Sequence, residues 1–306
     1  MNKLNFYHSL IFFNFCIFIS AFEYLRENSL LKISLFLILS LGISHGALDH
    51  IKGKKLLKIL NYKSTITFYL LYIIVGISII ILWLLFPKTL LLTFLFVASY
   101  HFGKEDSEFI TDNRNLDLFH FFKGSIVITA PLLFHKNETL NIFNILNFNV
   151  SQSFFVLDEF LYAFILMSFF SNIIISQNKG IDVKSLLLMD FTSVLLLNYF
   201  LNPILAFAVY FCFLHSIRHS IKLSKELNQN NLIKGFKKFI IKALPLTILT
   251  AFLFLMYLLY TLKISDLVTF LYLSISDDML YLPSLSHSHL EINVDLDARE
   301  VFMSIL

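Results

Sequence analysis

Charged residues are scarce in this chain. Asp, Glu, Lys and Arg make up only 15% of its 306 residues, whereas a soluble domain carries about a quarter. Hydrophobic residues account for 57% of the sequence, and the mean hydropathy is +0.75. This balance excludes an ordinary soluble domain and indicates an integral membrane protein.

Cysteine is nearly absent as well. The two cysteines, Cys16 and Cys212, lie inside apolar runs, which argues against a disulfide framework or a thiolate metal site. The apolar runs are continuous and do not alternate with polar residues, so membrane-spanning strands are not expected. The sequence also lacks an internal repeat and a low-complexity tail.

The lengths of the apolar runs predict an all-α, polytopic transmembrane bundle of about 9–10 helices, because a bilayer core requires about 20 apolar residues per helix. We expect a single domain over residues 1–282 and a polar tail over 283–306. The first run has no clear cleavage site and is interpreted as a retained helix, not a signal peptide. The expected spans are about 4–22, 31–48, 64–86, 89–103, 117–135, 153–176, 185–200, 203–219 and 239–262, with a weak tenth near 265–282.

Basic residues predict the orientation of these spans. Five lysines at 52–63 follow the second span, and seven Lys and Arg residues at 218–242, beginning with Arg218, flank the loop after the eighth. We assign both loops to the cytoplasm, which also places the N-terminus and the loops after the fourth and sixth spans there. The connections at Pro87–Lys88 and Asn202–Pro203 then lie outside. We interpret these charges as topology signals, with no nucleic-acid role.

Four histidines fall at the cytoplasmic ends of three predicted spans. His45 ends the second span, His101 ends the fourth, and His215 and His219 end the eighth. Polar groups inside a membrane are costly and by default indicate function. The topology was assigned from Lys and Arg alone, so it did not force these four imidazoles to the same depth in the membrane. Because they share that depth, we predict that they form a metal site.

Helical spacing supports this prediction. His215 and His219 are four residues apart, which places them on one helix face where both can bind one metal ion. Asp49, four residues after His45, can accept the free ring N–H of a ligand. Asp106, five residues after His101, is harder to place, because we expect the helix to end at Gly103.

The remaining histidines lack such spacing. We interpret His8, His120 and His135 as interfacial groups, with His120 as the reserve ligand, and His287 and His289 as loop residues. An imidazole shell suits iron, zinc, copper or nickel, and spacing does not choose among them.

Several functions fit a cluster of membrane histidines. A metal or proton transporter is the main alternative to an enzyme, although an ion path should distribute its polar groups across the whole membrane. A zinc hydrolase is disfavoured because the chain lacks H-E-x-x-H. A haem protein would take its ligands from facing helices.

Three motifs together resemble one family. They are G-x-x-H-G-A-x-D-H at Gly42–His50, H-F-G-K-E-D at His101–Asp106 and H-S-I-R-H at His215–His219. In this order, on hydrophobic helices, they resemble the Brp/Blh family of membrane-bound β-carotene 15,15′-dioxygenases found beside microbial rhodopsins. The likeness extends from about residue 30 to residue 278.

The resemblance implies an iron(II) enzyme that cleaves β-carotene at its central double bond with dioxygen. The products would be two molecules of all-trans-retinal, passed to a microbial rhodopsin, and the location would be a bacterial plasma membrane. The family's proposed iron ligands fall on His45, His101, His215 and His219, and we assign Asp49 and Asp106 to hydrogen bonds with these ligands. Some of the many Phe residues are expected to line a tunnel through which the polyene enters from membrane lipid.

The C-terminal stretch departs from the family pattern. The family usually ends with another hydrophobic helix that carries a Pro-His pair. After Asp277–Asp278, this chain continues into a polar stretch in which no bilayer-length span fits. One interpretation of this departure is that the final thirty residues are truncated or frame-shifted.

Overall fold

The structure is a computed structural model. It describes residues 2–21, 34, 37, 38, 53, 57, 65–110, 114–145 and 157–261. Every regular element within these residues is helical, as predicted. The α-helices are α1 (Asn2–Ser20), α5 (Thr65–Leu85), α6 (Pro87–Glu105), α7 (Asp117–Phe134), α8 (Lys136–Ile145), α9 (Asp158–Ile175), α10 (Ile181–Phe200), α11 (Pro203–Val209), α12 (Ser216–Leu227) and α13 (Leu232–Thr261). A short 3-10 helix, η4 (Arg114–Leu116), precedes α7, and a π-helix, η6 (Tyr210–His215), joins α11 to α12.

The helices occupy the predicted spans, but several of their ends differ. α6 continues to Glu105 and does not end at Gly103, α10 begins at Ile181, α12 continues to Leu227, and α13 begins at Leu232. The helix α8 was not expected. The predicted spans at 31–48 and 265–282 and the tail at 283–306 lie outside the described helices. Hydropathy therefore locates the helices well, but it does not register a polar last turn such as that of α6.

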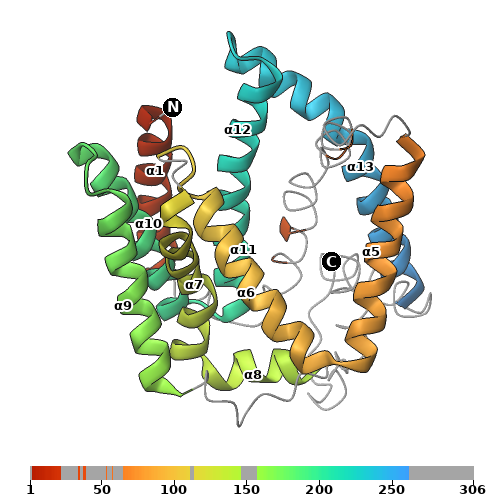
Figure 1. Cartoon of the computed structure of the whole chain (residues 1–306), viewed down its shortest axis with the longest axis horizontal. Coiled ribbons are helices and arrows are strands. Elements are labelled where there is room, and N and C mark those ends of the chain that lie inside the picture. The colour runs from red at the N-terminus through yellow and green to blue at the C-terminus, as the bar shows by residue number, and fades with distance from the viewer. Residues whose placement is uncertain are drawn as a thin grey trace, which may run out of the picture.

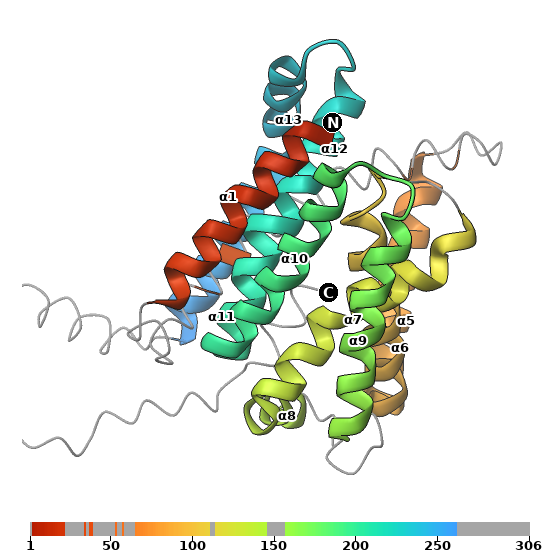
Figure 2. The ribbon, with the colours of Figure 1, turned by 90° about the vertical axis from the view of Figure 1, so that its left-hand side faces the viewer.

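The central bundle positions every element discussed below. α6 packs on α7, α7 packs on α9 and α10, and α1 packs on α10. The continuous rod α11–η6–α12 stands beside them, and α5 and α13 lie toward the other side of the molecule (Figures 1 and 2). The largest apolar core lies between α1, α6, α7, α10 and the α11–η6 segment.

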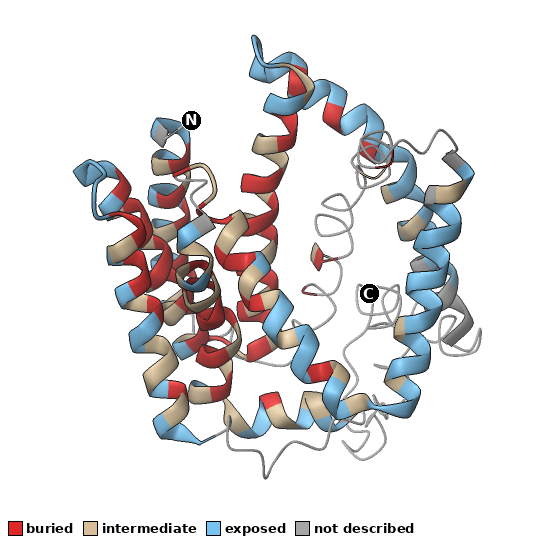
Figure 3. Cartoon of the chain, viewed as in Figure 1, coloured by how far each residue is buried: buried red, intermediate tan, exposed pale blue. Residues whose placement is uncertain are grey.

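The surface of the helices is apolar. α5 and α13 carry mostly exposed residues, whereas buried residues concentrate in α7, α10 and the α11–η6–α12 rod (Figure 3). Four of the described segments, those at 117–134, 158–175, 181–200 and 203–227, are long and apolar enough to cross a membrane. Since exposed aliphatic faces of this extent are unfavourable in water, length and composition identify a membrane protein.

The ends of the helices alternate as the charge pattern predicts. The N-terminus, the α9–α10 loop and the α12–α13 loop lie at one end of the molecule, while the α5–α6 turn, α8 and the start of α11 lie at the other (Figures 1 and 2). This agrees with the predicted relative placement of the loops. Which of the two ends faces the cytoplasm stays a prediction.

Two glycines let α6 and α7 approach backbone to backbone. A Cβ atom at Gly103 would lie 1.7 Å from the carbonyl oxygen of His120, and one at Gly124 would lie 2.0 Å from that of Ser99. Small residues permit such close helix contacts in membranes. The contact fixes the end of α6 against the core.

We predict that Gly103→Ala and Gly124→Ala each lower the free energy of unfolding by about 1–3 kcal/mol, the usual cost of overpacking. The reason is that the clashing atoms are backbone, which cannot move aside without separating the helices. Thermal unfolding in detergent measures the effect. Gly76→Ala is the matched control, because a Cβ there has no atom within 4 Å. Equal stability of all three variants would contradict the prediction.

Candidate metal centre and its supporting charges

Two consecutive carboxylates mark the end of α6. Glu105 is the last helical residue, and Asp106 follows as the C-cap with its N–H bonded to the carbonyl oxygens of Phe102 and Lys104. The side chain of Asp106 is 4% exposed, and that of Glu105 is 14% exposed. The extension of α6 beyond Gly103 is what carries both groups into the bundle.

Asp106 receives two hydrogen bonds from the π-helix. The Tyr210 hydroxyl donates to its Oδ2 at 2.6 Å, and Nδ1 of His215 lies 2.9 Å from its Oδ1. These two residues are five apart, which on an α-helix would leave them about 140° apart around the axis. In η6 the N–H of Ser216 bonds the carbonyl oxygen of Phe211, five residues earlier. This wider turn brings Tyr210 and His215 to the same carboxylate.

Glu105 binds the second histidine of the pair. Nδ1 of His219 lies 2.6 Å from Oε1 of Glu105. Lys222 donates to the same oxygen at 3.1 Å and also to Glu108. His215 and His219 therefore face neighbouring carboxylates of one helix end.

The hydrogen bonds define the state of both rings. A carboxylate can only accept, so Nδ1 carries the proton in His215 and in His219. In the neutral ring, the lone pair then belongs to Nε2. Metal-ligating histidines usually donate their other ring N–H to a carboxylate or carbonyl in this way, which fixes the tautomer and the ring orientation.

His101 lies next to His215 in an aromatic environment. Their ring centroids are 5.3 Å apart. Phe102 meets the His215 ring edge-on at 4.9 Å, and Phe211 stacks on it at 5.6 Å. Phe207 in turn stacks on Phe211 at 5.4 Å. One edge of His215 thus meets a carboxylate, and one of its faces is covered by Phe211.

Three of the four predicted ligands lie within the described residues, and their role as ligands stays a prediction. These three, His101, His215 and His219, lie at the α6–α12 contact, with Asp106 bonded to His215. No three His, Cys, Asp or Glu side chains in the described ranges are arranged as a metal-binding group. His45 and Asp49 lie outside those ranges. The donor types fit a first-row metal ion, and two of the rings have the carboxylate partners typical of ligands.

Arg218 corrects the interpretation of the basic residues. It was counted as a loop charge, yet it is 4% exposed and buried in the bundle. Its guanidinium forms a bidentate pair with Asp190 of α10, at 2.7 and 2.9 Å. It also donates to Ser9 of α1 at 2.5 Å and to the backbone oxygen of Asp106 at 3.3 Å. Arg218 is therefore a structural cation that connects four helices, and not a topology signal.

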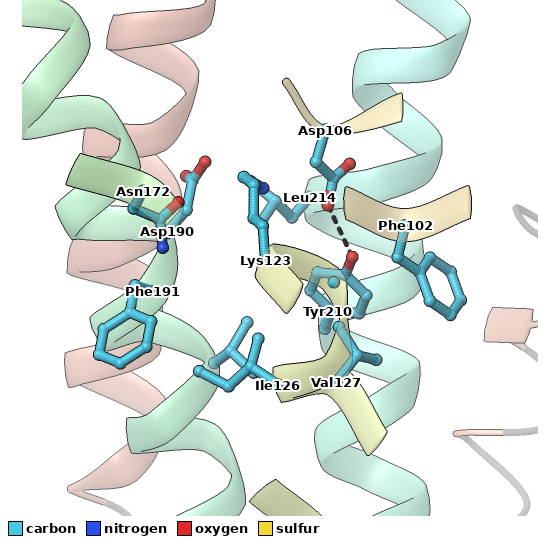
Figure 4. A pocket seen from close by; sticks show the side chains of 12 residues that line it. Phe102, Asp106, Lys123, Ile126, Val127, Asn172, Asp190, Phe191, Tyr210 and Leu214 are labelled. Atoms are coloured by element: carbon cyan, nitrogen blue, oxygen red, sulfur yellow. Dashed lines mark hydrogen bonds between the residues drawn. The ribbon is translucent and has the colours of Figure 1, made fainter. Parts of the chain in front are cut away.

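A small cavity, lined by both polar and apolar side chains, lies behind Asp106. It measures about 20 Å³ and is lined by Asp106, Lys123, Asn172, Asp190 and Tyr210, among other residues (Figure 4). This is room for a water molecule, which requires about 10–15 Å³. It is far below the roughly 300–1,000 Å³ of a pocket for a larger ligand. The cavity is therefore not the expected carotenoid tunnel.

Lys123 is the unusual member of this cavity. It is 7% exposed, and its ammonium group forms no ion pair within the described part of the chain. Across the cavity, Oδ1 of Asn172 has no hydrogen-bond partner among the described residues. Both groups face a space of water size (Figure 4), so a bound water would satisfy them.

Of the histidines interpreted as interfacial, His120 is buried and His8 is half-buried. His120 is 2% exposed, and its Nδ1 lies 2.9 Å from the Ser107 hydroxyl. Nε2 of His8 lies 2.8 Å from the carbonyl oxygen of Phe213. Each finds a partner on a neighbouring segment, which explains their position. His135 is partly exposed near Glu138, and His287 and His289 lie outside the described residues.

Comparison with known proteins now adds to this geometry. A model of the family described as "Beta-carotene 15,15'-dioxygenase" matches residues 36–277, most of the chain. The chain belongs to the β-carotene 15,15′-dioxygenase family. A relative named "Beta-carotene 15,15'-dioxygenase", from uncultured marine bacterium 66A03, is 26% identical over 196 residues, which are 63% of this chain and 70% of that protein. No solved structure matches.

Several buried polar groups of this dioxygenase-family chain were not predicted from its sequence. Glu105 lies four residues after His101 and so shares its helix face, a signal that was available. Lys123 and Asp190 are charges inside predicted spans, which should have indicated a role in the interior. Nothing in the spacing indicated Tyr210, because a π-helix brings it to Asp106.

We predict that breaking the Arg218–Asp190 pair is strongly destabilising. Asp190→Asn leaves the buried guanidinium without its carboxylate and should cost about 3–5 kcal/mol. The exposed pair Lys136–Asp158 provides the control, because Asp158→Asn should change stability by about 1 kcal/mol or less. Thermal unfolding in detergent compares the two. Similar small losses for both would show that Arg218 does not depend on Asp190.

Proposed function

We propose that this protein cleaves β-carotene at its central 15,15′ double bond, using dioxygen and a bound iron(II) ion. Family membership supports carotenoid cleavage. The observation that carries the metal proposal is the pair of histidines, His215 and His219, whose Nδ1 atoms bond consecutive carboxylates beside His101. We propose His45 as the fourth ligand on the sequence motif alone.

In the proposed reaction, each carbon of the central double bond receives one oxygen atom and the bond between them breaks. Two molecules of all-trans-retinal result, and no further reductant is needed. When bound, iron(II) would supply the activation of dioxygen. Transfer of the retinal to a microbial rhodopsin remains part of the proposal and rests on the family resemblance.

The chain's own residues have separable roles in this proposal. Asp106 and Glu105 hold the proton on Nδ1 of His215 and His219, so that each Nε2 is directed as a ligand. Phe102 and Phe211 cover the ring of His215 and present an apolar wall, which suits a polyene. The wall also excludes water from the imidazole. Asp49 is proposed to support His45 in the way that Asp106 supports His215.

Expression in a β-carotene-producing bacterium tests the proposal. The wild type should remove the orange carotenoid and produce retinal, measured by chromatography, and the purified protein should contain iron. His215→Ala should abolish both, and Asp106→Asn should weaken iron binding about 10–100-fold. His135→Ala is the control and should behave as the wild type. Unchanged carotenoid in cells that contain folded, iron-loaded protein would refute the proposed activity.

Labelled dioxygen tests the fate of the oxygen atoms. With ¹⁸O₂, both retinal molecules from each β-carotene should carry one ¹⁸O atom, provided that the aldehyde is trapped at once as its alcohol to prevent exchange with water. Mass spectrometry of the trapped alcohol measures the label. Label in only half of the product would indicate that one oxygen comes from water, and would exclude a dioxygenase.

A metal or proton transporter is the alternative, and the buried charges of Lys123, Asp190 and Arg218 are what favour it. These charges gather around one small cavity and the Arg218–Asp190 pair. Reconstituted vesicles distinguish the two functions. A transporter would move Fe²⁺ or protons across the membrane without carotenoid, and an enzyme would not.

A further inference from the structure

A histidine of α1 contacts the π-helix that carries His215. Nε2 of His8 lies 2.8 Å from the carbonyl oxygen of Phe213, within η6. A carbonyl oxygen only accepts, so the ring donates its Nε2–H. Its other nitrogen has no partner in the described part of the chain. The bond to Phe213 is therefore what orients this ring.

The shape of η6 decides where His215 points. Its wide turn lets Tyr210 and His215 share the Asp106 carboxylate. If the segment adopted α-helical geometry, each residue would advance by about 100°, and only one of the two could face Asp106. π-helices are rare and occur mostly as single turns inside α-helices, often at functional sites. This turn needs contacts that hold it.

We propose that His8 is a positioning residue, which holds η6 in its π geometry and so directs His215 toward Asp106. The next residue supports this role, because Ser9 accepts a hydrogen bond from Arg218 of α12. α1 thus contacts the rod on both sides of His215. The hydrogen bond from His8 locks the turn directly, and its consequence for the metal rests on the proposed function.

The first test measures the opening of the π-helix and does not depend on a bound metal. Cys212 is fully buried within η6, and Cys16 is the other cysteine of the chain. In a Cys16→Ala background, a membrane-permeable maleimide reports how often η6 opens. His8→Met should raise the labelling rate of Cys212 roughly two- to tenfold, as expected for the loss of one hydrogen bond. His8→Gln keeps an N–H donor of similar reach and should restore slow labelling.

His135→Met is the matched control, since His135 lies at the far end of α7, outside this contact. It should leave the labelling of Cys212 unchanged. If His8→Met and the wild type label at the same rate, the proposal is wrong. The same holds if His8→Gln labels as fast as His8→Met, because the donor would then be irrelevant.

The second test measures iron. The affinity for Fe²⁺, measured anaerobically with the metal alone, should fall about tenfold in His8→Met and recover in His8→Gln, as for other residues that orient metal ligands. Faster labelling together with unchanged iron affinity would overturn the link to His215. If the wild type itself binds no iron while labelling responds to His8, the proposed function fails and the role of His8 in the π-helix stands.

Discussion

The arrangement of this protein depends on how one buried carboxylate is shared. Asp106 accepts from His215 and from Tyr210, and its backbone oxygen accepts from Arg218. In a membrane interior, a charge without partners is very costly. The end of α6, the π-helix and α12 are therefore tied to positions in which this carboxylate is satisfied, and the candidate ligand His215 is placed as a consequence.

Glycine makes that sharing possible. Asp106 lies three residues beyond Gly103, where α6 touches the backbone of α7. A larger residue would hold the two helices apart and would move the acidic end of α6 with them. The polar interior thus depends on a contact made without side chains, as is usual where helices pack in lipid. The close backbone contact at Gly103 and the buried charge of Asp106 therefore lie within one turn of each other at the end of α6.

The sequence predicts the helices better than it predicts the polar interior. Continuous apolar runs define spans such as 117–135 closely, because a bilayer imposes both length and composition. The placement of His215 and His219 on one face followed from a spacing of four residues, and both reach the end of α6. A spacing of five argues against partnership on an α-helix, so the joint contact of Tyr210 and His215 with Asp106 could not be foreseen. Arg218 was misread because a basic residue near a span end resembles a topology signal until its partner, Asp190, is seen in space.

His215 lies between a charged environment and an aromatic one. On its Nδ1 side lie Asp106 and, behind it, a charged network around Arg218 and a cavity of water size. Phe211 stacks on one face of the ring, and Phe102 meets the ring edge-on. His215 is fully buried, so Asp106 can hold the ring from one side while the protein shields it from water. The proposed oxidation of an apolar polyene would need both conditions at once, since a metal ligand must be fixed and water must be kept from the reacting bond. The buried charges of this chain therefore fit the support of the proposed site, because they hold His215 from its Nδ1 side while aromatic side chains surround the ring.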